Sequence, residues 1–437
     1  MTNRRKILKA VGVTGIAGLA GCIGNGNDDS DGNGGDGDNN TNGTNGGDSD
    51  TIKIGAYGPL TGPASNIGQA MKLGFDLAQK QINADGGMAG YDVEVVYGDS
   101  ESEPSTGKSA VEYLINQENV DMIAGGFHSD VSLAVVEVTY SADVPQMISN
   151  SVSGSINEKM ESQNMKNVFK MSPPSEAYGI GWNGFLNDLQ DEGVGYFPFE
   201  NKRIALIAED TSYGLPIMES TTENLEENGW DVVSTDEVAV DETNYRSLLT
   251  RIKSNEPDVV WAVQTAPSPA ANLVSQFREM GFGDTHFMQT FVPSNPEFAN
   301  LAGDAANGVM WMANIGVVPE FARDVGLVEA WDDEYGEEVP GSSGSLPWDN
   351  LMLIKAAMEE IGSLDDLTVD SWSEAVLGLD QIKGSAGYFD WTEDGPFHQA
   401  LYGKDTIPAL GHQIQDGNNR FVWPFNVGEH EIDESYY

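Results

Sequence analysis

From residue 51 onward, short apolar runs alternate with stretches in which apolar residues recur every three or four positions. Residues 52–57 (IKIGAY) form one such run, whereas Ile67, Met71, Phe75 and Ala78 share the spacing of one helix face. The first pattern predicts a buried strand and the second predicts an amphipathic helix. The same alternation predicts further strands at residues 92–98, 120–126 and 145–149, with helices at 105–117 and 130–142 between them.

After the sequence KMSPPS (170–175) the alternation begins again. It predicts strands at residues 202–210, 231–240, 258–264 and 286–290, and helices at 212–228, 245–254 and 270–280. Successive strand–helix units form parallel sheets with helices on both faces. Two such series therefore predict an α/β protein with two doubly wound parallel-sheet lobes. Beyond residue 308 the pattern predicts a helix at 350–361 and a strand at 409–417.

Ligands of open parallel sheets bind beyond the carboxyl ends of the strands. The loops at these ends are rich in Ser, Thr and Gly, and they read GPLTGPASN, GGFHSD, SNSVSGS, AEDTSYG, QTAPSP and QTFVPSN. Within GGFHSD, Ser129 comes just before a predicted helix, where a hydroxyl and free N–H groups can hold an anion. Serine is also a favoured helix cap, so both interpretations of Ser129 stay open.

The N-terminal stretch has the composition of an export signal, with four basic residues among the first nine and an apolar run at residues 10–20. This run is shorter than the roughly 20 residues that span a bilayer. Arg4 and Arg5 are adjacent, which is typical of the twin-arginine route. LAGC (19–22) resembles the lipobox of prokaryotic lipoproteins and predicts that cleavage leaves a lipid anchor on Cys22, the only cysteine. The alternative is an ordinary secretory signal with an incidental cysteine.

Residues 23–50 are almost entirely Asp, Asn, Gly, Ser and Thr, and a segment so poor in apolar side chains is expected to be a disordered tether. The whole chain carries 69 acidic and 22 basic residues, a formal charge of −47. Loss of residues 1–22 would leave −51, because they hold four basic and no acidic residues. This charge argues against nucleic-acid binding. It also indicates a salt-loving host, because molar salt shortens the Debye length to about 3 Å and screens the repulsion.

The opening of the folded part, GAYGPLTGPASNIGQAMKLGFDLAQKQINADGGMAGYDVEVVYGDSESEP, resembles the leucine/isoleucine/valine-type solute-binding proteins of ABC importers. VDMIAGG, KRIALIAEDTSYG and PDVVWAV…FREMGF follow in the order found in that family. The resemblance implies a type I periplasmic-binding fold, in which two lobes joined by three crossovers close over a small ligand. It assigns residues 51–171 and 314–404 to the first lobe, and residues 172–313 and 405–437 to the second.

The same resemblance implies individual ligand contacts. Ser129 matches the serine that binds the ligand's carboxylate, and Ser151 and Ser153 match two contact positions on the next loop. Tyr213 matches an aromatic residue that closes over the ligand, although a tyrosine there can equally be part of the core.

Two positions depart from the pattern of the amino-acid binders. Their ammonium-binding acid falls on Phe291, or on Thr290 if the alignment slips by one residue. Their cleft tyrosine falls near Ala266. A buried ammonium needs a partner, so another carboxylate, such as Asp210 or Asp349, would have to supply it if the ligand is an amino acid.

Together these features predict a monomeric, lipid-anchored extracytoplasmic protein that binds a branched-chain amino acid or a related carboxylate or amide and delivers it to an ABC permease and its ATPase. The alternative is a sensor of the same fold that acts through a membrane partner. Catalysis, a cofactor and a metal site are not expected. The five histidines are scattered singly, and neither a G-x-S-x-G nor an H-E-x-x-H motif occurs.

Overall fold

The computed structural model describes residues 51–191, 199, 201–424 and 428–436. The predicted signal (1–22) and tether (23–50), including Cys22, lie outside the described residues. Within the described part of the chain, no helix combines the length and the apolar character needed to cross a membrane.

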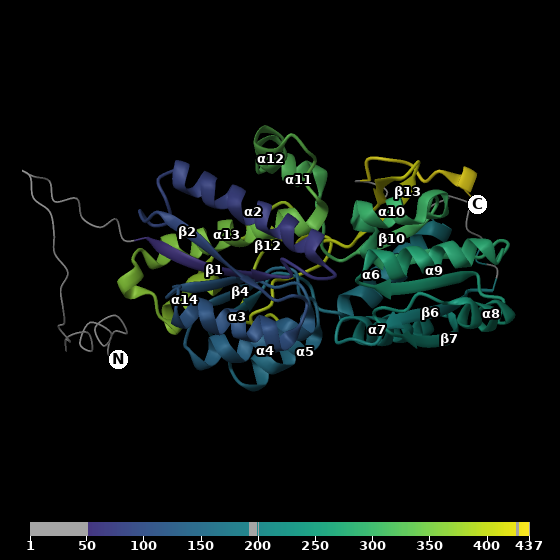
Figure 1. Ribbon diagram of the computed structural model, residues 1–437, viewed down its shortest axis with the longest axis horizontal. Coiled ribbons are helices and arrows are strands. Elements are labelled where there is room, and N and C mark those ends of the chain that lie inside the picture. Colours follow the sequence, from purple (N-terminus) through teal and green to yellow (C-terminus); the bar gives the residue numbers. More distant parts are fainter. Residues whose placement is uncertain (1–50, 192–198, 200, 425–427, 437) are drawn as a thin grey trace, which may run out of the picture. The chain divides into compact units, whose positions relative to one another are not determined.

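The first sheet has five strands in the order β2-β1-β3-β4-β5, and all of its neighbouring pairs are parallel. These strands are β1 (Ile52–Gly58), β2 (Val93–Asp99), β3 (Met122–Gly125), β4 (Gln146–Ile148) and β5 (Val168–Lys170). Figure 1 shows α2 (Ser65–Ala84) and α13 (Gly341–Ile361) on one face of the sheet. The other face carries α3 (Pro104–Asn116), α4 (Ser129–Ser141) and α5 (Gly154–Ser162).

The second sheet has seven strands in the order β14-β13-β10-β9-β8-β6-β7. Five are parallel, namely β6 (Arg203–Glu209), β7 (Asp231–Val238), β8 (Val259–Gln264), β9 (His286–Phe291) and β10 (Met310–Ala313). The late strands β13 (Leu410–Gln415) and β14 (Asn418–Trp423) extend this sheet in antiparallel fashion. The predicted α/β class with two doubly wound lobes is confirmed, with an antiparallel hairpin added at one edge of the second sheet.

Helices cover both faces of the second sheet as well (Figure 1). They are α6 (Glu176–Asp191), α7 (Gly214–Glu227), α8 (Arg246–Ser254), α9 (Pro267–Glu279) and α10 (Pro296–Ala302). The remaining elements are α11 (Pro319–Asp324), α12 (Leu327–Tyr335), α14 (Val369–Gly378), and the two-residue strands β11 (Ile382–Lys383) and β12 (Tyr388–Phe389). Single 3-10 turns lie at Val292–Ser294, Gly303–Ala306, Leu364–Asp366 and Glu434–Tyr436.

The helix predicted at residues 350–361 begins nine residues earlier, at Gly341. Its first part, GSSGSLPW, has the composition of a loop, but these small residues are buried against α2. The backbones approach so closely there that a Cβ added to Gly74 would lie 2.1 Å from the carbonyl oxygen of Gly344. Small residues are therefore required at this helix–helix contact, and the apolar periodicity that marks a helix is weakened there.

The first core combines residues from both ends of the folded chain. Ile52, Phe75 and Met147 pack in one cluster with Leu346 and Ile407. The second sheet has a separate cluster on each of its faces. The chain passes between the first core and the second-sheet elements three times, between Met171 and Tyr178, between Ala313 and Ile315, and between Ile407 and Leu410.

Candidate functional site

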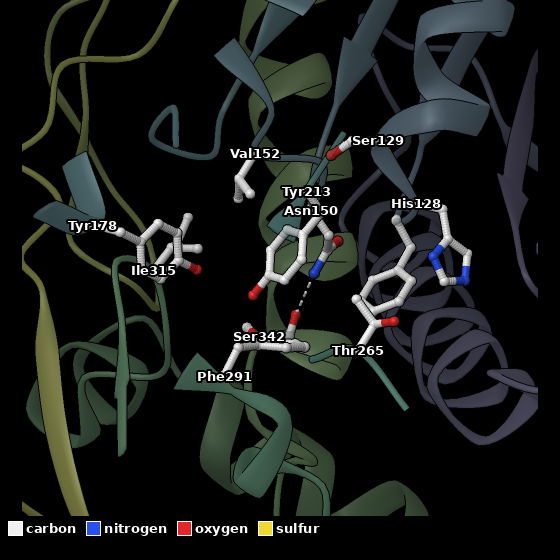
Figure 2. Close-up of a pocket in the computed structure, with 11 residues that line it drawn as sticks. His128, Ser129, Asn150, Val152, Tyr178, Tyr213, Thr265, Phe291, Ile315 and Ser342 are labelled. Carbon is white, nitrogen blue, oxygen red and sulfur yellow. Dashed lines mark hydrogen bonds between the residues drawn. The ribbon is translucent and has the colours of Figure 1, made fainter. Parts of the chain in front are cut away.

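A pocket lies where the carboxyl ends of strands from both sheets face one another (Figure 2). It contains about 440 Å³ of space between atoms, including the part that opens to solvent. The first sheet contributes the loops after β3 and β4, and the second contributes the loops after β6 and β8 and the end of β9. The lining residues are Phe127, His128, Ser129, Asn150, Val152, Tyr178, Tyr213, Thr265, Phe291, Ile315 and Ser342.

Ser129 is the first residue of α4 and is 3% exposed. Its Oγ accepts a hydrogen bond from the backbone N–H of Ser153 at 3.2 Å, and His128, which precedes the helix, makes no side-chain cap. The hydroxyl of Ser129 is thus engaged with the neighbouring loop and does not cap its own helix. Because Oγ already accepts a bond, its proton remains available to a group in the pocket.

Ser151 and Ser153 are fully buried, and neither side chain lines the pocket. The Ser151 hydroxyl pairs with Ser132 Oγ at 2.6 Å and donates to the Phe127 carbonyl at 3.1 Å. Ser153 caps α5, because its Oγ accepts from the N–H of Ser155. Both hydroxyls hold the loop in place in this structure, while Asn150 and Val152 are the loop residues that reach the pocket. Their direct contact with a ligand stays a prediction.

Tyr213 and Tyr178 place two phenol hydroxyls at the pocket from the second-sheet side (Figure 2). Burial raises the pKa of Tyr178 to about 12, although the nearby Tyr213 hydroxyl and the Asn314 backbone oppose this effect. Burial, together with the neighbouring Tyr178 and Glu209, raises the pKa of Tyr213 well above its ordinary value. Both phenols are therefore neutral at physiological pH and can donate hydrogen bonds to a solute.

Phe291 ends β9 with a backbone φ of 59° and ψ of −52°. A non-glycine residue in this region is strained, and such strain is concentrated at functional sites. The ring of Phe291 lies 6.0 Å from the ring of Phe127, centroid to centroid, so the two walls of the pocket contact each other there. Thr290 instead faces the core, where its Oγ1 accepts from the Trp182 indole at 3.2 Å. Of the two residues that could match the family's ammonium-binding acid, Phe291 is therefore the one that lines the pocket.

A buried carboxyl group, Glu209, lies directly behind the second-sheet wall and was not singled out in the sequence. Its Oε2 accepts from the N–H and the hydroxyl of Thr265 at 2.9 and 3.1 Å, and its Oε1 accepts from Thr211 at 3.4 Å. Burial raises the pKa of Glu209 to about 7, and these hydrogen bonds only partly offset that effect. Asp349, by contrast, is bonded to Ser385 and does not line the pocket.

No lining residue of the pocket, within the described chain, carries a full charge at neutral pH. The one titratable imidazole, His128, has a pKa lowered to about 4 by burial. The walls therefore offer aromatic and aliphatic surface, neutral hydrogen-bond donors and the N-terminal end of α4. This combination suits a small solute with an apolar body and one polar or anionic end.

The sequence profile of a family described as periplasmic binding protein matches residues 51–403. The chain belongs to this family. A Leu/Ile/Val-binding protein homolog 2 from Brucella abortus is 26% identical to this periplasmic binding protein over 259 residues, which cover 59% of this chain and 66% of that relative. The match thus extends over just under two thirds of the relative's length.

Two solved structures show the same fold as this periplasmic binding protein. One is a putative branched-chain amino acid ABC transporter from Silicibacter pomeroyi, with a TM-score of 0.78 and 23% sequence identity. The superposition covers 88% of this chain and 99% of the Silicibacter chain. The other, a solute-binding protein of an ABC transporter from R. palustris in complex with benzoate, has a TM-score of 0.69 and 18% identity. This superposition covers 85% of this chain and 95% of the R. palustris chain. The structures share the predicted fold, and the family match identifies the chain as a periplasmic binding protein.

Of the residues that the sequence singled out, Ser129, Tyr213 and Phe291 meet at the pocket of this periplasmic binding protein. The sequence placed the family's cleft tyrosine near Ala266. In the structure Ala266 is the N-cap residue of α9, and the preceding residue, Thr265, lines the pocket. Glu209 was missed, although it stands in the same AEDTSYG loop as Tyr213. No local signal marks it, because an acid at the end of a strand is usually exposed and the burial of Glu209 depends on the distant Thr265.

Proposed function

We propose that this protein is the extracytoplasmic binding subunit of an ABC importer, captures a small carboxylate by cleft closure and delivers it to the permease and its ATPase. In this proposal residues 51–171 and 314–404 form one lobe, residues 172–313 and 405–437 form the other, and a lipid on Cys22 holds the protein at the outer face of the membrane. The core clusters support two lobes joined by three crossovers, because the chain passes between them three times, and Ile407 in the first core puts the third passage just after that residue.

The observation that carries the proposal is the composite pocket. Ser129 and Asn150 come from loops of the first sheet, whereas Tyr213, Thr265 and Phe291 come from the second. A solute held by both walls stabilises the closed arrangement, and rigid lobes on flexible crossovers are a common way to couple closure to binding. The N-terminal end of α4 and the Ser129 hydroxyl form the place for the solute's carboxylate.

The apolar walls favour a carboxylate whose other end is a branched or aromatic hydrocarbon. The names of the Brucella relative and of the benzoate complex span this range, from leucine, isoleucine and valine to benzoate. The aromatic rings of Phe127 and Phe291 lie where a planar body would contact them. An aromatic carboxylate therefore fits the uncharged second-sheet wall better than an ammonium-bearing solute does.

The test is a thermal-shift screen followed by calorimetry with benzoate, hydroxybenzoates, leucine, isoleucine, valine and the matching amides. A ligand that binds only the folded form raises the melting temperature by mass action. Ser129→Ala should weaken binding of the best carboxylate by about 1.5–3 kcal/mol, the range for a hydrogen bond to a charged group. Ser141→Ala, at the exposed end of the same helix, is the control and should bind normally.

Equal affinities for Ser129→Ala and the unchanged protein would contradict the assignment of the carboxylate to α4. A screen in which no carboxylate of this set raises the melting temperature would contradict the proposed ligand class.

A further inference from the structure

A lysine is buried behind the first-sheet wall of the pocket. Lys170, at the end of β5, has no exposed surface. Its Nζ donates to the Val152 carbonyl at 3.3 Å, to Asn157 Oδ1 at 3.0 Å and to Gln399 Oε1 at 3.1 Å. All three acceptors are neutral, and no ion pair forms at this ammonium within the described chain. A buried charge without a counter-charge is costly, which raises the question of what balances it.

The hydrogen bonds lead from Lys170 toward the pocket through a single peptide group. The Val152 carbonyl accepts from Lys170, and the N–H of the same peptide, on Ser153, donates to Ser129 Oγ at 3.2 Å. Carbonyl and N–H point in opposite directions across a planar trans peptide. The Lys170 charge thus polarises this peptide and directs the Ser129 hydroxyl proton away from the loop, because aligned hydrogen bonds strengthen one another.

Other groups around Lys170 do not neutralise its charge. Glu176 on α6 acts on it from a distance and is itself exposed. From α5 the neutral Asn157 faces it, and from the segment after β12 the neutral Gln399 does. The neighbouring His398 directs its ring to the Val168 carbonyl and stacks on Phe169. Burial lowers the pKa of Lys170 to about 7, and Glu176 opposes this effect.

We propose that Lys170 supplies the positive charge that selects an anionic solute, acting through the Val152–Ser153 peptide and the Ser129 hydroxyl. This inference rests on the proposed function, since it assigns the solute's carboxylate to Ser129. A carboxylate at that place provides the missing counter-charge, so that solute binding and protonation of Lys170 favour each other. Lys170 is a positioning residue, because Val152 and Ser153 separate it from the pocket.

The sign of the resulting pH dependence is fixed by this linkage. Binding of an anion raises the pKa of Lys170 above its value of about 7 in the free protein. The affinity for the carboxylate is therefore highest below that pH, where Lys170 is protonated before binding. It falls as the pH rises, by about tenfold or more between about pH 6 and about pH 9. Near pH 7 the protein should take up about half a proton for each carboxylate bound, because Lys170 is then half protonated before binding.

The experiment is calorimetry with benzoate and its neutral amide, benzamide, and with leucine, in buffers of different ionisation enthalpy, which reports proton uptake directly. The carboxylate that binds should show both the uptake and the fall in affinity, and benzamide, which has no group that titrates between about pH 6 and about pH 9, should show neither. Glu209→Gln should keep both effects. This variant is required because Glu209 titrates in the same range on the opposite wall.

Lys170→Met should bind the carboxylate about tenfold more weakly at about pH 6, without pH dependence and without proton uptake. Lys166→Met is the matched control, because Lys166 is a half-exposed lysine of the same strand region that pairs with Asp370 at 3.3 Å. It should behave as the unchanged protein. The measurements on the unchanged protein do not depend on whether Lys170→Met folds.

Carboxylate binding without proton uptake would overturn the role of Lys170 and leave the proposed function intact. Equal pH dependence for the acid and its amide would overturn it as well. If no carboxylate of the screening set binds, the proposed function fails together with this inference.

Discussion

Replacement of Glu209 by glutamine should make the protein markedly more stable at alkaline pH. Glu209 is 1% exposed, and its hydrogen bonds come from Thr265 and Thr211, which carry no charge. Burial raises its pKa from 4.5 to about 7. The neutral carboxyl group is therefore favoured in the folded protein, whereas the unfolded chain ionises it at lower pH.

The size of the effect follows from linkage. A folded-state pKa that is raised contributes stability below the unfolded pKa and loses it as the pH rises through the folded value. At 1.36 kcal/mol per pKa unit, the shift of Glu209 corresponds to about 3 kcal/mol between about pH 4.5 and pH 8. Glutamine retains the shape and the acceptor oxygen for the Thr265 N–H but does not ionise.

Urea unfolding of both proteins, followed by intrinsic tryptophan fluorescence at constant salt, measures the difference. The free energies of unfolding of the two proteins should be similar at about pH 5. At about pH 8.5 the free energy of unfolding of Glu209→Gln should exceed that of the unchanged protein by about 3 kcal/mol. Glu226→Gln, on the exposed side of α7, should track the unchanged protein. A difference between Glu209→Gln and the unchanged protein that does not vary with pH would show that Glu209 is solvated or paired with a cation, and would refute the reasoning.

Three further predictions concern the anchor, the salt dependence and the helix packing. Cys22→Ser should release the protein from the membrane or leave its signal uncleaved, as read by fractionation, and unchanged attachment would exclude a lipid on Cys22. The chain has a formal charge of −47, so its melting temperature should fall as the salt concentration is lowered from about 1 M to about 0.1 M, because the repulsion between acidic side chains is then less screened. A melting temperature that stays constant over this range would contradict the prediction. Gly74→Ala should destabilise by about 1–3 kcal/mol in urea unfolding, because its Cβ would meet the Gly344 carbonyl oxygen at 2.1 Å. Gly378→Ala, with no atom within 4 Å of its added Cβ, should not destabilise.

Apolar spacing was sufficient to predict most strands and helices of both sheets. Alternation along residues 52–142 predicted β1 to β3 and α2 to α4, because each element there shows one clear period. The start of α13 could not be predicted in this way, since its small residues are selected by the close approach of α2. Short or polar helices such as α5 lacked a readable apolar face.

The candidate site was predictable only in part, and for a physical reason. Ser129 and Tyr213 stand in loops whose position at strand ends can be read from the chain. Lys170 and Glu209 are charged residue types that are usually exposed. Their importance comes from burial by segments more than 50 residues away, such as Gln399 over Lys170 and Thr265 over Glu209. Sequence patterns report local periodicity, and they do not report which distant segment covers a side chain.

The first core combines segments from the beginning and from near the end of the folded chain, and this limits how early in synthesis the first lobe can fold. Ile52, Phe75 and Met147 leave the ribosome early, but the Leu346 and Ile407 side chains that cover them are synthesised hundreds of residues later. The first lobe therefore cannot complete its core during translation as an N-terminal domain ordinarily does. Its apolar face must stay exposed or shielded by a chaperone until the chain is nearly finished, and completion requires slow, long-range contacts. A route that exports the folded chain would accommodate this order, because export would begin only after α13 has docked.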